Sequence, residues 1–169
     1  FVWKPRWFVL AQTDGEPLTN AVEIPSWDEA RALEALAVQR IPFDLPDGNV
    51  QGFAHGRSVA VSPIAALPAK TLFHELGHVL LNHTAERGDD RPDLPKTLTE
   101  AEAEAVALLC LEALHIPGAE YARGYIQSWY GAGNPLPEHS AQRIFKAADT
   151  ILRAGRNEAV REAADRGAA

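Results

Sequence analysis

The spacing of hydrophobic positions changes along the chain, from strand-like and mixed at the start to helical later on. Residues 1–13 are rich in aromatic and β-branched side chains and end at a turn signal, which predicts a strand. Apolar positions three and four apart predict an amphipathic helix over residues 27–40. Over residues 50–62 the period shortens to two, which predicts a β-hairpin with its turn at His55-Gly56.

From residue 64 onward the strand pattern stops and helical spacing dominates. We predict four helices, over residues 67–83, from 97 or 99 to 115, from 117 to about 130, and from 138 onward. Strands followed by helices are typical of an α+β domain rather than of alternating α/β units. Because 169 residues match the size of one domain, we expect a single domain over residues 1–169.

Composition narrows the possible functions. The net charge of -7 argues against a dedicated nucleic-acid binder, and no apolar run approaches the roughly 18 residues that cross a membrane. Cys110 is the only cysteine, which excludes an intrachain disulfide and any metal site built on several thiolates. This cysteine usage indicates a reducing compartment, so we expect a cytoplasmic protein whose metal ligands are histidines and carboxylates.

A short motif on the predicted helix 67–83 carries the clearest chemistry. His74 and His78 are four residues apart, so a helix presents both imidazoles to a single metal ion. Glu75 lies one position round, beside the ion, where its carboxylate can take a proton from an activated water. The other positions are mostly apolar, and burying these polar groups would be costly without a metal. The alternative is a chance occurrence of the motif on an ordinary buried helix.

A catalytic zinc site needs a third protein ligand. The metzincin spacing would put a third histidine at position 84, so we expect His83 to be a solvated residue at the helix end, stabilised by the helix dipole. Glu100 and Glu104 share a face of the next helix, whereas Glu102 points roughly the other way. One of the pair can bind the metal while the other accepts a hydrogen bond from a ligating imidazole. Alternatively, the glutamates only stabilise the first turn of their helix.

Peptide hydrolysis also needs a donor for the developing oxyanion. Four candidates follow the motif in helical context: Tyr121, Tyr125, Tyr130 and His115. We rank Tyr125 first among them. The alternative is that Tyr121, Tyr125 and Trp129, spaced four apart, form an aromatic stripe that packs in the core.

Two helical motifs together resemble a known family. They are His74-Glu75-Leu76-Gly77-His78 and Glu100-Ala101-Glu102-Ala103-Glu104, and they resemble the ImmA/IrrE-type zincins and, more closely, the metallopeptidase domain of ArdC-type antirestriction proteins. Residues 8–15 and 121–129 extend the resemblance over most of the chain, from about residue 3 to residue 129. It implies a zincin-like metallopeptidase fold in which Zn²⁺ is held by His74, His78 and Glu100, with Glu104 as a supporting residue.

The same resemblance implies how a substrate binds and that the chain is part of a longer protein. In zincins a strand such as residues 58–62 lies at the edge of the cleft, where an extended substrate can add to it. ArdC-type proteins also carry an N-terminal domain that binds single-stranded DNA, and residues 1–15 are expected to be its last strand. Together with the absence of methionine, this predicts a domain cut from a longer protein.

Three hypotheses about function follow. The first is a cytoplasmic zinc endopeptidase of the gluzincin type, acting on a protein or peptide such as a regulatory DNA-binding protein. The second is an antirestriction module with a structural zinc, which contacts single-stranded DNA through the basic and aromatic residues Trp3, Lys4, Arg6 and Trp7. The third is an inactive zincin fold that serves as a protein-interaction module.

Overall fold

The computed structural model describes residues 26–45, 49–84, 94–130 and 137–156, with side chains for all of these except 127–130. The predicted strand at residues 1–13 and the proposed DNA-contacting residues Trp3, Lys4, Arg6 and Trp7 lie outside this part of the chain. In the described part, no helix is long and apolar enough to cross a membrane.

The first helix is shorter than the sequence pattern predicts. Helix α1 (Glu29–Ala35) begins after Asp28, whose carboxylate accepts a hydrogen bond from the Arg31 amide at 2.7 Å. Ala37 has a positive φ of 50°, which turns the chain out of the helix. The prediction of a helix up to residue 40 is therefore wrong at its end, where Gln39–Arg40 form strand β1 instead.

The predicted hairpin is confirmed, but its turn lies at Gly56-Arg57 and not at His55-Gly56, because His55 is the last residue of its first strand. Strand β2 (Gly52–His55) pairs antiparallel with β3 (Ser58–Val61), and Gly56 takes the positive φ of 55° that the tight turn requires. Strand β1 pairs parallel with the other side of β3, so the order is β1-β3-β2. Strand β3 is thus the central strand and is paired on both sides, which contradicts the expectation that an extended substrate adds to residues 58–62. The sequence pattern did not predict β1.

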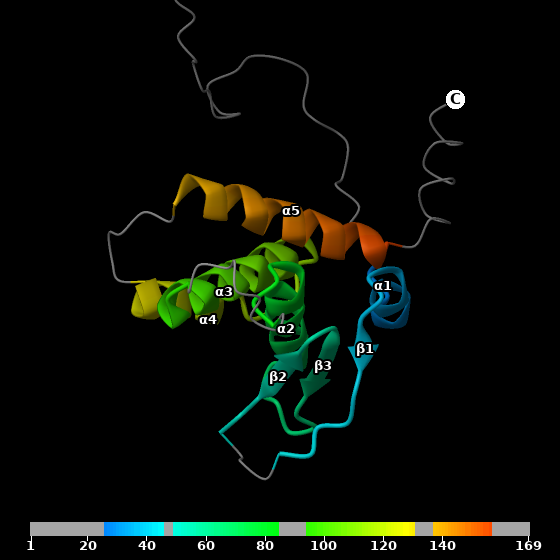
Figure 1. The fold of residues 1–169 in the computed structure, drawn as a ribbon. Coiled ribbons are helices and arrows are strands. Elements are labelled where there is room, and N and C mark those ends of the chain that lie inside the picture. The colour runs from blue at the N-terminus through cyan, green and yellow to red at the C-terminus, as the bar shows by residue number, and fades with distance from the viewer. Residues whose placement is uncertain (1–25, 46–48, 85–93, 131–136, 157–169) are drawn as a thin grey trace, which may run out of the picture.

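In the part of the chain that the structure describes, four helices follow the sheet, which confirms the α+β class. They are α2 (Pro68–Leu80), α3 (Lys96–Ala113), α4 (Ala119–Tyr130) and α5 (Glu138–Ala154). Helix α2 lies between the sheet and α3, and α3 in turn contacts α4 and α5 (Figure 1). The helix that carries the histidine motif is therefore covered on both sides.

Helix α2 is held in place by its apolar side chains. Phe73, next to His74, is buried and packs edge-on against Trp27, with ring centroids 4.9 Å apart. The Trp27 indole donates a hydrogen bond to the carbonyl of Ile151 in α5 at 3.0 Å. Through Trp27, these contacts connect α2 to α5 next to His74.

A glycine lets α2 and α3 approach closely. A Cβ added to Gly77 would lie 3.1 Å from the Ala103 Cα, 3.2 Å from the Ala103 carbonyl oxygen and 3.3 Å from the Val106 Cβ. Two of these neighbours are backbone atoms, which cannot rotate away. The absence of a side chain at Gly77 therefore sets the distance between the two helices.

We expect Gly77→Ala to destabilise the protein and to weaken metal binding. Overpacking costs about 1–3 kcal/mol, which outweighs the gain of up to about 1 kcal/mol from alanine in a helix. Gly124→Ala in α4 is the matched control, because no atom in the described part of the chain lies within 4 Å of its added Cβ. Urea denaturation should show Gly124→Ala at or above wild-type stability and Gly77→Ala below it. Equal stabilisation of both variants would contradict the close approach.

Candidate metal centre

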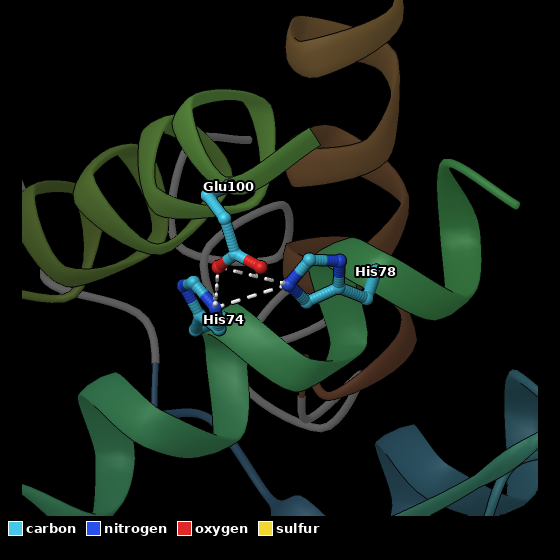
Figure 2. Close-up of side chains that lie close together, drawn as sticks. All are labelled: His74, His78 and Glu100. Carbon is cyan, nitrogen blue, oxygen red and sulfur yellow. Dashed lines mark hydrogen bonds and ion pairs between the residues drawn. The ribbon is translucent and has the colours of Figure 1, made fainter. Parts of the chain in front are cut away.

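Three polar side chains from α2 and α3 converge on one point (Figure 2). His74 and His78 lie one helical turn apart, and their Nε2 atoms are 3.1 Å from each other. The Glu100 Oε2 atom lies 3.4 Å from the His74 Nε2 and 3.6 Å from the His78 Nε2. All three ligand atoms lie within 4.8 Å of one another, so this group could hold a metal ion.

The donor set suits a metal of the zinc type. Two imidazole nitrogens and one carboxylate oxygen are the ligands of many catalytic zinc sites, which keep a further position open. All three residues are partly buried and line a pocket of about 420 Å³. A cation between them would satisfy both Nε2 atoms and the carboxylate at once.

The electrostatics of the site favour a positive charge at His74. Burial alone lowers the pKa of His74, but contacts with the Glu100 and Glu104 carboxylates raise it to about 9. In turn, contacts with His74 and His78 hold the pKa of Glu100 well below its ordinary value. A metal ion would therefore replace a proton on His74 and keep the attraction to Glu100.

This proton gives metal binding a pH dependence. Because the folded His74 has a pKa of about 9, the metal must displace a proton at neutral pH, and its apparent affinity should rise about tenfold per unit between pH 7 and 8.5. In the metal-free protein the same shift stabilises the fold fully below pH 6.5, and this stabilisation is lost as the pH rises through about 9. Calorimetric titration with zinc in buffers of different ionisation enthalpy measures the released proton. Binding without proton release would contradict the protonated His74.

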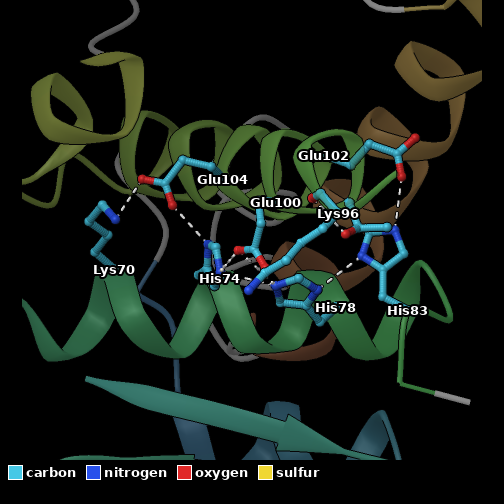
Figure 3. A network of polar contacts seen from close by, with 9 residues as sticks. Lys70, His74, His78, His83, Lys96, Glu100, Glu102 and Glu104 are labelled. Atoms are coloured by element: carbon cyan, nitrogen blue, oxygen red, sulfur yellow. Dashed lines mark hydrogen bonds and ion pairs between the residues drawn. The ribbon is translucent and has the colours of Figure 1, made fainter. Parts of the chain in front are cut away.

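Glu104 contacts His74 at Nδ1, the ring nitrogen that is not directed at the metal position. Its Oε2 atom lies 2.8 Å from the His74 Nδ1, and its Oε1 atom lies 2.5 Å from the Lys70 Nζ (Figure 3). Burial raises the pKa of Glu104, but these two partners together hold it below its ordinary value. The carboxylate can accept the Nδ1–H of His74, which leaves Nε2 for a metal.

His83 lies in a place that contradicts the expectation of a solvated residue. Its side chain is only 5% exposed, with Nδ1 3.0 Å from the His78 Nδ1 and Nε2 2.9 Å from the Glu102 Oε2. Helix α2 ends at Leu80, and Asn82 has a positive φ of 61°. This turn lets the His83 amide donate to the His78 carbonyl at 2.8 Å, so the His83 ring folds back beside His78. Helical spacing rules miss such a contact because it is five residues away.

The glutamates do not act as first-turn residues of α3. That helix begins at Lys96, and its first turn contains no acidic residue. Glu100 faces the two α2 histidines, while Glu102 is fully buried beside His83 and Ser140. Burial raises the pKa of Glu102, but contacts with His83, Ser140 and Arg143 lower it below its ordinary value.

Glu75 lies in the same pocket, beside the convergent group. Its side chain is buried, and a Cβ added to Gly52 in β2 would lie 3.1 Å from its Oε1 atom. Burial is the main reason that its pKa is raised. A carboxylate with a raised pKa, next to a metal site but outside its ligands, is suited to accept a proton.

Tyr125 lies at the protein surface, beside Lys70. Its side chain is 53% exposed, and its ring centroid lies 4.9 Å from the Lys70 Nζ, outside the residues that line the pocket. Its role as an oxyanion donor therefore stays a prediction. Tyr121 is also exposed, so the alternative of a buried aromatic stripe is wrong for these two tyrosines.

Comparisons with known proteins identify no relative of this chain. The chain matches no protein-family model, and no curated protein or solved structure is detectably similar to it. Fold and site together define an α+β domain with a His74, His78 and Glu100 group that could hold a metal ion.

Proposed function

We propose that this protein is a zinc-dependent endopeptidase of the gluzincin type. The observation that carries the proposal is the convergence of the His74 and His78 Nε2 atoms with the Glu100 Oε2 atom at 3.1–3.6 Å. Glu75 lies in the same pocket with a raised pKa. The sequence resemblance to ImmA/IrrE-type and ArdC-type metallopeptidase domains supports the same activity and a zincin-like fold.

Each residue has a defined role in this proposal. His74, His78 and Glu100 hold the ion, and Glu104 orients His74. When bound, zinc supplies a Lewis acid that polarises a peptide carbonyl and lowers the pKa of water. The Glu75 carboxylate accepts the proton of the attacking water and delivers it to the leaving amine.

The substrate is proposed to bind as an extended chain along β2. Residues 52–54 line the same pocket as His74 and His78, and within the described chain β2 pairs only with β3. Its other edge can offer backbone groups to a peptide, as in strand addition. Because Gly52 has no side chain, this strand can lie close to Glu75. A Cβ at this position would collide with the side chain of Thr71. The strand beside the cleft is thus β2, in place of residues 58–62.

Cleavage of a peptide library tests the proposal. The zinc-loaded protein is incubated with random peptides and with a denatured protein, and the products are identified by mass spectrometry. We expect internal cleavage that is lost with a chelator and restored by zinc. If the zinc-loaded protein cleaves none of these substrates, the endopeptidase assignment is wrong even if the metal centre is present.

A further inference from the structure

We propose that His83 and Glu102 form a hydrogen-bonded chain that positions His78 for metal binding. The inference rests on the proposed metal centre and adds two positioning residues to it. Neither residue offers a ligand atom to the group formed by His74, His78 and Glu100. They act through His78, from the side of its ring that faces away from the metal position (Figure 3).

The chain is continuous and buried. It runs from the His78 Nδ1 to the His83 Nδ1 over 3.0 Å, and from the His83 Nε2 to the Glu102 Oε2 over 2.9 Å. The Glu102 side chain is fully buried, and that of His83 nearly so. Water therefore has little access to these polar atoms, and each depends on the next for its hydrogen bond.

The metal position at His78 and the carboxylate of Glu102 determine where the protons of the hydrogen-bonded chain lie. A histidine that binds a metal through Nε2 keeps its proton on Nδ1, so His78 must donate to His83. The His83 Nδ1 is then an acceptor, and its proton lies on Nε2, where it is donated to the Glu102 carboxylate. The chain thus selects the tautomer of His78 whose Nε2 lone pair is free for a metal.

Helix α5 also holds the Glu102 end of the hydrogen-bonded chain in place. Arg143 donates a hydrogen bond to the Leu81 carbonyl at 2.5 Å, which holds the turn after α2, and its Nη1 lies 3.9 Å from the Glu102 Oε1. The positive charge favours the ionised form of the buried Glu102. Helix α5 therefore supports both the turn that places His83 and the carboxylate that receives its proton.

The two α2 histidines are supported in different ways. His74 contacts the Glu104 carboxylate directly at 2.8 Å. On its Nδ1 side, His78 reaches a carboxylate through a second imidazole, that of His83. Loss of such supporting contacts typically costs about 10–100-fold in metal affinity. If the chain positions His78, both carboxylates matter, but only the effect of Glu102 requires His83.

The zinc affinity of His83 variants tests whether the hydrogen-bonded chain positions His78. His83→Leu removes the acceptor for the His78 Nδ1–H, whereas His83→Asn keeps an acceptor oxygen near the position of the original Nδ1. By chelator competition, we expect His83→Leu to lower zinc affinity about 10–100-fold and His83→Asn to restore most of the loss. The visible spectrum of the cobalt-substituted protein should change in the leucine variant and return toward wild type in the asparagine variant.

Double variants distinguish positioning from general loss of structure. Glu102→Gln should weaken zinc binding in the wild-type background and have no further effect when His83 is leucine. Glu104→Gln is the matched control, and its effect should add to that of His83→Leu because it acts on His74. Wild-type zinc affinity in His83→Leu, or equal loss in His83→Leu and His83→Asn, would overturn the chain. A wild-type protein without zinc affinity would overturn the metal centre as well, whereas zinc binding without cleavage would overturn only the endopeptidase.

Discussion

Replacing Glu75 with glutamine should abolish peptide cleavage and leave zinc bound. Glutamine has nearly the same shape as glutamate but cannot accept the proton of the attacking water, and a general base contributes about 10²–10⁴-fold to the rate. Glu75 is not among the three convergent ligand atoms, so the ion keeps all its protein ligands. Cleavage rates on a substrate from the peptide library, together with zinc content, measure the two effects separately.

Glu34→Gln is the matched control for this substitution. Glu34 is exposed on α1 and lies outside the pocket, so the same change of charge there should leave cleavage unaltered. If Glu75→Gln cleaves the substrate at the wild-type rate, Glu75 is not the base. If it loses zinc together with activity, the separation of base from ligand is wrong.

Glu100→Gln should cause the largest loss of zinc affinity among the glutamate variants of α3. Glu100 contributes the only carboxylate oxygen of the convergent group, so its neutralisation should cost more than the roughly 10–100-fold typical of supporting contacts. Glu102→Gln and Glu104→Gln should fall within that smaller range, because they contact histidines and not the metal position. Chelator competition on all three variants gives the order.

The expected order also depends on the two α2 histidines being near Glu100 and not near Glu102. Glu100 lies within 3.6 Å of both Nε2 atoms, whereas His83 is the histidine that Glu102 contacts. Equal zinc retention in Glu100→Gln and Glu102→Gln would refute Glu100 as the third ligand. The loss of stability of each variant, measured without metal, is the reference against which the affinities are compared.

Local spacing was sufficient to predict part of the site. The four-residue separation of His74 and His78 places both rings on one face of a helix wherever that helix lies. The alternation over residues 50–62 likewise predicted the hairpin of β2 and β3. The shared face of Glu100 and Glu104 was also predictable, and the structure gives each of them a contact with His74.

Features that depend on tertiary contacts were beyond these local patterns. The close approach of α2 and α3 at Gly77 and Ala103 is one such feature, because no periodicity within either helix predicts which residues of the other helix it contacts. His83 reaches His78 through the turn at Asn82, which no helical period describes. The two residues of β1 are too few to show an alternation, yet their pairing with β3 makes β3 the central strand of the sheet.

The zinc content of the purified protein tests the central claim most directly. Elemental mass spectrometry of the wild-type protein and of His74→Ala, after dialysis against metal-free buffer and addition of one equivalent of zinc, measures occupancy of the site. We expect one zinc per chain in the wild-type protein and none in His74→Ala. Absence of zinc from the wild-type protein, or its full retention in the variant, would contradict a metal centre at His74, His78 and Glu100.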